Sequence, residues 1–454
     1  MRLGLEIALA RAVGTLSRLA GQGGGTTLPG KLLAAVDPGA IRRLAARLPH
    51  GCALVSATNG KTTTAAMAAE ILSPRRVLAH NRSGANLVSG VASTLLAARD
   101  AELGLLEADE GAMPDIAERV RPRAICLANL FRDQLDRYGE LELIAERWRT
   151  AVDRLEPSVA LIVNGDDPQV GDLGRDRPGR VVFGLDDPRH ARPALQHAAD
   201  SKYCLRCGTP YDYAAAYVGH LGDYRCPACG HARPGLDIAA RNIEPHGLAG
   251  TAFDLVLPGE TRRIELPLPG LYNVYNALAA AALARALGAA ADEIESGLER
   301  FSAAFGRFER IQVGERALLV LLIKNPAGAN EVVRTLVDAD PPSLLVVALN
   351  DEIADGRDVS WIWDVDFEPL LEGLDRLVAT GGRAAELALR FKYGGLEEDR
   401  IEVVPDLARA LDRGLELTPP GGELVLLPTY TAMLALRRVV VDRGFVRPYW
   451  ERAA

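Results

Sequence analysis

Residues 56–64 read SATNGKTTT, in which Gly60 and Lys61 are followed at once by three threonines. The preceding run, GCALVS, is short and apolar like a buried parallel strand, and the TTTAAMAAEIL that follows is rich in helix-forming residues. A loop between a strand and a helix presents backbone N–H groups and the positive end of a helix dipole to an anion. The stretch therefore predicts a polyphosphate site, although the usual phosphate-loop pattern places a further glycine where this chain has Val55.

The composition is that of an ordinary globular protein. The 454 residues are enough for two or three domains, and 48% are hydrophobic and 25% charged. A formal net charge of -8 gives no global positive field to attract nucleic acid. We therefore expect no nucleic-acid partner.

The first 21 residues, MRLGLEIALARAVGTLSRLAG, contain Glu6 and Arg11 within an apolar run. The interruption leaves the run too short for a membrane span and unlike an export signal. The Leu and Ile spacing predicts an amphipathic helix packed on the protein, with a helix on the inner membrane face as the alternative. We expect a cytoplasmic protein, peripheral at the inner membrane face in the second case.

Strand and helix patterns alternate along the chain. Strands with polar ends are predicted in GLLEAD, RAICLANL and SVALIVNGDD, and a long helix in GLYNVYNALAAAALARALG. A second α/β segment begins near Ile311, with strands in ALLVLLI, SLLVVALN, RLVATG and ELVLLP. Since ligands of open parallel sheets bind beyond the carboxyl ends of the strands, the polar ends should meet in one crevice. We place a domain border between 308 and 309.

Three acidic residues lie at the tip of the predicted GLLEAD strand. Glu107, Asp109 and Glu110 occupy three of four positions in an apolar neighbourhood. Mg²⁺ bound to a nucleotide takes one or two carboxylates together with phosphate and water. We expect these acids and Thr62 at the metal, with Lys61 on the outer phosphates.

Four of the six cysteines form two C-x-x-C pairs, Cys204 with Cys207 and Cys226 with Cys229, separated by 18 residues. Such pairs hold Zn²⁺ tetrahedrally with no position open to water, so we expect a structural zinc site in an insertion over 201–234. His220 and His231 are expected at the surface nearby. Cys52 and Cys126 lie in predicted strands, where buried packing roles are expected.

The stretch LNDEIADGRDVSWIWDVDFE, residues 349–368, follows a predicted strand and holds seven acids and two tryptophans. Trp361 and Trp363 beside clustered carboxylates indicate a binding surface or a pocket. Two core tryptophans beside a charged turn are the alternative.

Taken in order, several of these motifs resemble the central ATPase domain of Mur ligases and folylpolyglutamate synthases. They are TNGKTT, the acids at Glu107, NLFRDQLDRYGE (129–140), NGDDP, LYNVYNALAA and FGRFER. With the cysteine insertion, KNPAGANE (324–331) and DGRDVSWIWDVDFE, the chain resembles the MurT-type family of Mur ligases, the synthetase subunits of lipid II isoglutaminyl synthase. The resemblance implies a Mur-ligase-like ATP-binding domain over 1–308 and a Rossmann-like α/β domain over 309–454 that contacts a glutaminase.

The resemblance also implies site residues and cofactors. ATP and Mg²⁺ would be bound by Thr58, Asn59, Gly60, Lys61, Thr62, Thr63, Glu107, Asn273, Asn276 and Arg307. In this reading Lys61, Thr62 and Glu107 belong to the triphosphate and magnesium site. Asn273 and Asn276 lie near the adenine, and Arg307 reaches the phosphates from the domain junction.

Some positions depart from ordinary Mur ligases. Those enzymes usually have glycine at Ala57, a metal-binding histidine at Gln134 and a carbamylated lysine soon after, whereas 144–156 contains no lysine. We also expect no precursor-binding amino-terminal domain before residue 50. These departures are shared with the MurT-type family.

The implied reaction is amidation of the D-glutamate α-carboxylate in the lipid II stem peptide, through an acyl phosphate, to D-isoglutamine. Ammonia would come from a class I glutaminase partner of the GatD type. An aspartate of this chain would complete the partner's cysteine and histidine triad. Asp358 is our first choice and Asp355 the second, with Asp351 also considered.

Two alternatives remain open from the sequence. One is a ligase complete in a single chain, similar to folylpolyglutamate synthase. The other is a zinc-ribbon NTPase that binds nucleic acid, for which the insertion offers Lys202, Arg206, Arg225 and Arg233.

Overall fold

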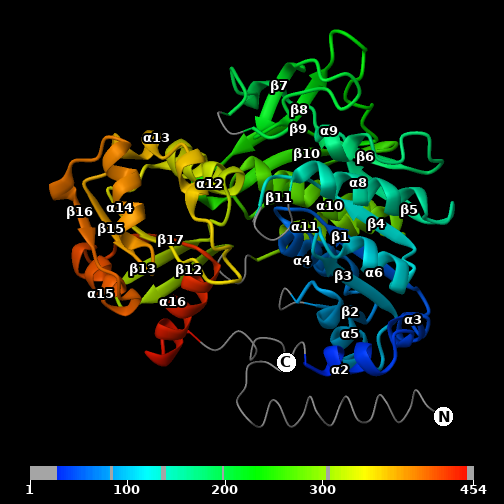
Figure 1. The fold of residues 1–454 in the computed structure, drawn as a ribbon, viewed down its shortest axis with the longest axis horizontal. Coiled ribbons are helices and arrows are strands. Elements are labelled where there is room, and N and C mark those ends of the chain that lie inside the picture. Colours follow the sequence, from blue (N-terminus) through cyan, green and yellow to red (C-terminus); the bar gives the residue numbers. More distant parts are fainter. Residues whose placement is uncertain (1–27, 82–84, 134–139, 197–198, 303–306, 447–454) are drawn as a thin grey trace.

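A computed structural model describes residues 28–81, 85–133, 140–196, 199–302 and 307–446. Two α/β lobes lie side by side, with a small hairpin on the first (Figure 1). The predicted N-terminal helix at 1–21 falls outside the described residues. Within them, no helix is both long and apolar enough to cross a membrane.

The first lobe is built on a nine-stranded sheet. Along the sheet, its strands are β11 (Glu260–Leu266), β10 (Thr251–Leu257), β9 (Ile238–Pro245), β6 (Val181–Leu185), β5 (Ala160–Asn164), β4 (Ala124–Leu127), β1 (Cys52–Ser56), β3 (Leu103–Ala108) and β2 (Leu78–His80). The helices of this lobe are α2 (Leu28–Val36), α3 (Ala40–Ala45), α4 (Lys61–Leu72), α5 (Val88–Ala97), α6 (Met113–Val120), α8 (Leu141–Asp153), α9 (Pro168–Gly171), α10 (Leu271–Ala286) and α11 (Ala291–Glu299).

The middle of this sheet is parallel, as predicted. Every residue of β1 is buried, because hydrophobic clusters cover both faces of the sheet. Ser56 at the end of β1 pairs with Ala108 of β3 and with Leu127 of β4. This register brings the loops that follow the three strands to the same edge.

Three further strands, which were not expected from the sequence, extend the sheet. β9, β10 and β11 form an antiparallel meander, which β9 joins to the parallel part by pairing with β6. Residues of β11 are exposed and buried in a mixed pattern, so its apolar run is too broken to be recognised as a buried strand.

The second lobe holds a six-stranded sheet in the order β12 (Arg307–Val313), β13 (Arg316–Leu321), β17 (Glu423–Pro428), β14 (Leu344–Ala348), β15 (Arg376–Thr380) and β16 (Ile401–Val403). Its helices are α12 (Pro326–Ala339), α13 (Glu368–Leu371), α14 (Ala384–Tyr393), α15 (Leu407–Leu417) and α16 (Tyr430–Asp442). The four strands predicted after Ile311 are confirmed as β13, β14, β15 and β17. Residue 308 lies inside β12, and a domain border at 308/309 stays a prediction.

Candidate active site

The predicted phosphate loop connects β1 to α4, and its shape depends on Gly60. Gly60 has φ +84°, and a Cβ there would lie 1.9 Å from Asn276 Oδ1. Asn276 belongs to α10 and donates to Asn273 Oδ1 at 3.2 Å. Only glycine satisfies both the backbone conformation and this close approach. Asn276 therefore contacts the loop directly, Asn273 supports Asn276, and the predicted place of both near the adenine stays a prediction.

The loop after β4 holds the phosphate loop from the other side. Thr58 N donates to Asn129 O at 2.9 Å, and Phe131 N donates to the Thr58 hydroxyl at 3.0 Å. Asn59 N donates to Asn129 Oδ1 at 2.9 Å, and Asn129 Nδ2 donates back to Asn59 O at 3.0 Å. The Thr58 hydroxyl is thus used within the protein. Thr62 and Thr63, half-buried and buried, lie in the first turn of α4.

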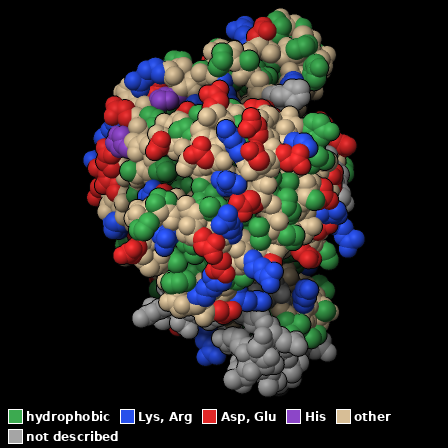
Figure 2. Space-filling view, turned by 90° about the vertical axis from the view of Figure 1, so that its left-hand side faces the viewer, with side chains coloured by type: hydrophobic (Ala, Val, Ile, Leu, Met, Phe, Trp, Pro, Cys, Tyr) green, Lys and Arg blue, Asp and Glu red, His purple; other side chains and the backbone are tan. Residues whose placement is uncertain are grey.

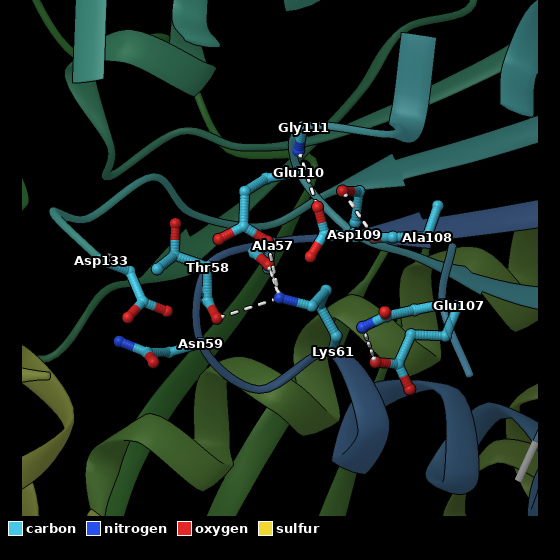
Figure 3. Close-up of polar contacts among 12 residues, drawn as sticks. Ala57, Thr58, Asn59, Lys61, Glu107, Ala108, Asp109, Glu110, Gly111 and Asp133 are labelled. Carbon is cyan, nitrogen blue, oxygen red and sulfur yellow. Dashed lines mark hydrogen bonds and ion pairs between the residues drawn. The ribbon is translucent and has the colours of Figure 1, made fainter. Parts of the chain in front are cut away.

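Lys61 begins α4 and is buried in an ion pair. Its Nζ lies 2.8 Å from Glu110 Oε2, and it also donates to the carbonyls of Thr58, at 3.1 Å, and Ala57. Figure 3 shows the amino group turned back toward these carbonyls. Trp148 Nε1 donates to Glu110 O at 2.8 Å, which fixes the backbone of Glu110. The sequence predicts that Lys61 contacts phosphate, but it does not identify Glu110 as the partner of Lys61.

Glu107 has an oxygen suited to a metal ion. Its Oε1 accepts from Asn86 Nδ2 at 3.0 Å, and its backbone N–H donates to Asn81 Oδ1 at 2.8 Å. Glu107 Oε2 is buried without a hydrogen-bond partner, which is costly unless a cation or a ligand completes it. This orphaned oxygen fits Mg²⁺, a hard cation that prefers carboxylates. Asp109 Oδ1 accepts from Gly111 N at 3.1 Å.

A lysine from the second lobe also reaches the phosphate loop. Lys324 Nζ lies 3.0 Å from Thr58 O and 2.5 Å from Asp133 Oδ2. The neighbouring Asn325 exchanges amide hydrogen bonds with Asn59, at 3.2 and 3.0 Å. Asp133 Oδ1 is buried without a partner. The motif KNPAGANE was noticed in the sequence, but its contact with a loop 266 positions away could not be inferred from it.

Burial and neighbouring charges shift the pKa values of Lys61, Glu110 and Asp133. Burial opposes the charge of Lys61, but Glu110, Asp109 and Glu107 together raise its pKa above the ordinary value. Burial likewise opposes ionisation of Glu110, yet Lys61 and Lys324 hold its pKa below the usual range. Burial raises the pKa of Asp133 despite the opposing effect of Lys324. Lys61 and Glu110 are therefore both charged at neutral pH.

The four predicted zinc ligands come together at the base of a hairpin, β7 (Asp212–Val218) and β8 (Leu221–Arg225). All four sulfurs lie within 4.8 Å of one another, with 3.5 Å from Cys204 to Cys229 and from Cys207 to Cys226. A tetrahedral zinc with bonds of about 2.3 Å needs sulfurs about 3.8 Å apart, so the residues present fit this metal. Gly208 and Gly230 both have positive φ, at 73° and 74°, as each loop turns back on itself.

The expectation that His220 and His231 lie at the surface is wrong. His220 is 0% exposed and His231 3% exposed. His231 lies among Tyr211, whose hydroxyl is 2.7 Å from Nδ1, and Asp172, 3.1 Å from Nε2. Both rings are buried because the insertion packs on the first lobe. Cys52 and Cys126 are buried as expected.

The three candidate triad aspartates have different surroundings. Asp351 pairs with Arg383 at 2.8 Å. Asp355 is buried and accepts from Thr431 N at 2.8 Å and from the Thr431 hydroxyl, which ties its loop to α16. Asp358 is exposed and accepts from Ser360 N at 2.9 Å. Its carboxylate is therefore the most accessible of the three.

The two tryptophans of this stretch have separate roles. Trp361 packs against the core of the second lobe. Trp363 is 48% exposed and lies 6.0 Å from the Tyr393 ring, with Arg390 over its face. One of them is thus a packing residue and the other contributes to the surface. Gln134 and the Arg307 side chain fall outside the described residues, so their predicted roles stay predictions.

Comparisons with known proteins identify relatives along the whole chain. Residues 55–207 match the family Mur ligase middle domain, and residues 322–433 match the family MurT ligase C-terminal. The chain is 34% identical to the lipid II isoglutaminyl synthase (glutamine-hydrolyzing) subunit MurT of Streptococcus pneumoniae, over 95% of both chains. It is 31% identical to the protein of the same name from Staphylococcus aureus, over 95% of this chain and 96% of that one.

Solved structures show the same fold at lower identity. A pseudomurein peptide ligase type C from Methanothermus fervidus superposes with a TM-score of 0.69 at 22% identity, covering 89% of this chain and 80% of that one. A MurF ligase from Thermotoga maritima in complex with ADP superposes with a TM-score of 0.64 at 15% identity, covering 91% of this chain and 84% of that one. The Mur-ligase-like fold expected from the sequence is confirmed.

Replacing Lys61 by Met should lower the free energy of unfolding by about 3–5 kcal/mol, because Glu110 would keep a buried charge without its partner. The double variant Lys61→Met with Glu110→Gln should regain most of this loss and still bind ADP poorly. Thermal denaturation and calorimetric titration with ADP measure both effects. A wild-type unfolding midpoint for Lys61→Met would show that the pair is not the buried constraint described above.

The purified protein should contain one zinc ion per chain, measured by inductively coupled plasma mass spectrometry. Cys204→Ser should lose most of it, because a structural site needs all four thiolates. Cys52→Ala, a buried cysteine outside the cluster, is the matched control and should keep the metal. Full zinc content in Cys204→Ser would contradict the assignment.

Proposed function

The chain belongs to the MurT family of Mur-type ligases, and we propose that it amidates the D-glutamate α-carboxylate of the lipid II stem peptide to give D-isoglutamine. Membership of the family makes it a peptidoglycan-modifying ligase. The observation that carries the proposal is the phosphate loop at the end of β1, with the orphaned Glu107 oxygen and Lys61 beside it, in a chain that matches the MurT relatives over 95% of its length. The substrate is named from those relatives.

The proposed chemistry has two steps. An oxygen of the substrate carboxylate attacks the γ-phosphorus of ATP, the bond from that phosphorus to ADP breaks, and an acyl phosphate forms. Ammonia then attacks the acyl carbon, inorganic phosphate leaves with its oxygen, and the nitrogen loses a proton to give the amide. Both steps build negative charge on phosphoryl oxygens, which positioned cations stabilise.

Residues of this chain suit the first step. Lys61 and Lys324 place two ammonium groups beside the Thr58 carbonyl, at 3.1 and 3.0 Å. Glu107 and Thr62 would hold Mg²⁺, which supplies positive charge to the phosphate oxygens when bound. The second lobe has to be in contact with the first for Lys324 to take part, so we propose that contact between the lobes accompanies catalysis.

The chain's own thiols do not suit glutamine hydrolysis. Burial raises the pKa of both Cys52 and Cys126 to about 12, which leaves each as an unreactive thiol at neutral pH. The other four cysteines belong to the proposed zinc site. Glutamine-derived ammonia would therefore come from a separate chain, which agrees with the relatives being named as subunits. We propose a class I glutaminase of the GatD type.

Asp358 is the residue that we propose to complete the partner's triad. A triad carboxylate has to lie where the partner's histidine can reach it, and it has to be ionised. Asp358 is exposed, and hydrogen bonds from the Ser360 side chain and backbone keep the pKa of its carboxyl below the usual value. Asp355 meets both requirements less well than Asp358. Burial raises the pKa of its carboxyl, and both of its oxygens accept hydrogen bonds from Thr431.

The two alternative functions gain less support. A ligase complete in one chain would not need the accessible Asp358 loop, and the relatives are subunits. A nucleic-acid-binding NTPase would need a continuous basic surface. Figure 2 shows acidic and basic side chains interspersed over the one face of the second lobe that it presents. In the insertion, Arg206 pairs with Asp172 and Arg233 with Asp166. We propose that the protein works in the cytoplasm, where it meets lipid II at the inner membrane face.

Asp358→Asn should lower glutamine-driven amidation by at least about 100-fold in the presence of the glutaminase, because an amide cannot orient and stabilise the partner's imidazolium. Amidation driven by added ammonium chloride should stay within about 2-fold of wild type. Asp399→Asn, another exposed aspartate of the second lobe, is the control.

The readout is the amount of amidated lipid II, separated by chromatography, with each nitrogen source. An equal loss with glutamine and with ammonium would place Asp358 outside the glutaminase site. Amidation from glutamine by the chain alone would remove the need for a partner.

A further inference from the structure

The tip of the β7–β8 hairpin is buried against the loop that follows β4. The tips of most hairpins face solvent. Here the His220 side chain is fully buried, and its ring lies 4.7 Å from the Phe131 ring. Gly219 has φ +58°, and a Cβ there would lie 2.8 Å from Phe131 Cε1. The turn is therefore fitted closely to one aromatic side chain.

Phe131 in turn holds the phosphate loop. Its N–H donates to the Thr58 hydroxyl at 3.0 Å, and that hydroxyl donates to Phe131 O at 3.3 Å. Thr58 is also the residue whose carbonyl accepts from both Lys61 and Lys324. A shift of Phe131 would therefore move the carbonyl that positions both ammonium groups.

A second contact joins His220 to the same loop. His220 Nε2 lies 3.4 Å from Asp167 Oδ2, and this oxygen accepts from Leu130 N at 2.8 Å. Asp167 is itself fixed as the N-cap of α9, where it accepts from Gln169 N at 2.8 Å. The His220 ring thus contacts Phe131 directly, and it is connected to the preceding residue, Leu130, by way of Asp167.

The outer side of the hairpin contacts the second lobe. Arg334 of α12 donates to Tyr217 O at 2.9 Å. Arg192, whose N–H donates to Ala216 O at 2.7 Å, pairs with Glu331 of α12 at 2.8 Å. The N-cap of α12 is Asn325, the residue that pairs with Asn59 in the phosphate loop. The hairpin therefore contacts two elements that hold the phosphate loop, the loop after β4 in the first lobe and α12 in the second.

The cysteine pairs stand immediately before and after this hairpin. Cys207 lies shortly before β7, which begins at Asp212, and Cys226 follows directly after Arg225, the last residue of β8. A metal that fixes the two pairs to each other fixes the base of the hairpin. A hairpin alone is only marginally stable in water, so the position of its tip depends on such a constraint.

We propose that the β7–β8 hairpin positions the phosphate loop for nucleotide binding, with His220 acting on Thr58 through Phe131. The cysteine insertion then serves the ligase reaction without touching the substrates. The proposal rests on the proposed function, since it takes a nucleotide as the ligand of the phosphate loop. His220 is a positioning residue, because it contacts neither lysine of the site.

The test compares His220→Ala, which removes the ring, with His220→Phe, which keeps the aromatic contact and loses the one to Asp167. His246→Ala, an exposed histidine of the same lobe, is the control. Calorimetric titration with ADP and Mg²⁺ should show about 2- to 10-fold weaker binding for His220→Ala, the range expected for loss of one aromatic pair. His220→Phe should lie between His220→Ala and wild type.

Steady-state kinetics should show an effect on ATP binding that is larger than the effect on turnover. The KM for ATP should rise for His220→Ala, while kcat at saturating ATP changes less, because the reacting groups are intact. Hydrogen exchange, read by mass spectrometry, should increase over residues 127–133. Wild-type affinity and unchanged exchange at 127–133 in folded His220→Ala would overturn the proposal.

A double-mutant cycle covers the case in which His220→Ala does not fold. Phe131→Leu removes the same contact from the other side and should weaken ADP binding alike. If His220 acts through Phe131, His220→Leu, which fills the space without an aromatic ring, combined with Phe131→Leu should lose less binding than the sum of the two single losses. Fully additive losses would contradict that route.

The outcomes also separate this proposal from the proposed function. A wild-type protein that does not bind ADP would remove the nucleotide function, while the exchange experiment would still report on the contact between hairpin and loop. A wild-type protein that binds ADP, with a His220→Ala variant that binds it equally well, would leave the function standing and remove only the positioning role.

Discussion

The buried ion pair between Lys61 and Glu110 is the constraint on which the site depends. An ammonium group taken out of water without a partner costs several kcal/mol, so the lysine of a phosphate loop inside a folded protein needs a carboxylate close by. The parallel register of β1 and β3 supplies it, because Ser56 at the end of β1 lies beside Ala108, just before Asp109 and Glu110. The loop is thereby held ready before any phosphate arrives.

The remaining parts of the site follow from the same edge of the sheet. The loop after β4 bonds the backbone of Thr58 and Asn59, α10 leaves no space for a side chain at Gly60, and the second lobe adds Lys324. Activation of a carboxylate would take place there, whereas the exposed Asp358 lies in a loop of the second lobe. Ligase and proposed glutaminase chemistry are thus assigned to different elements, which agrees with the relatives being named as subunits.

Local patterns were sufficient to predict part of this structure. The strand, loop and helix around Gly60, the acids at the end of β3, the four strands after Ile311 and the cysteine cluster each depend on residues close together in sequence. In the antiparallel meander β9 to β11, the apolar pattern of β11 is broken, and this strand was missed for that reason. The pairing of Glu110 with Lys61, the reach of Lys324 and the burial of His220 and His231 all depend on contacts between distant segments, for which a single sequence carries no signal.

The most direct test of the account is a crystal structure of the protein with Mg²⁺ and a non-hydrolysable ATP analogue. We predict that the β- and γ-phosphates lie against the backbone N–H groups that follow Gly60, with Lys61 Nζ in contact with a phosphate oxygen and the metal on Glu107. A structure with the analogue bound elsewhere, and Lys61 still paired only within the protein, would contradict the central claim.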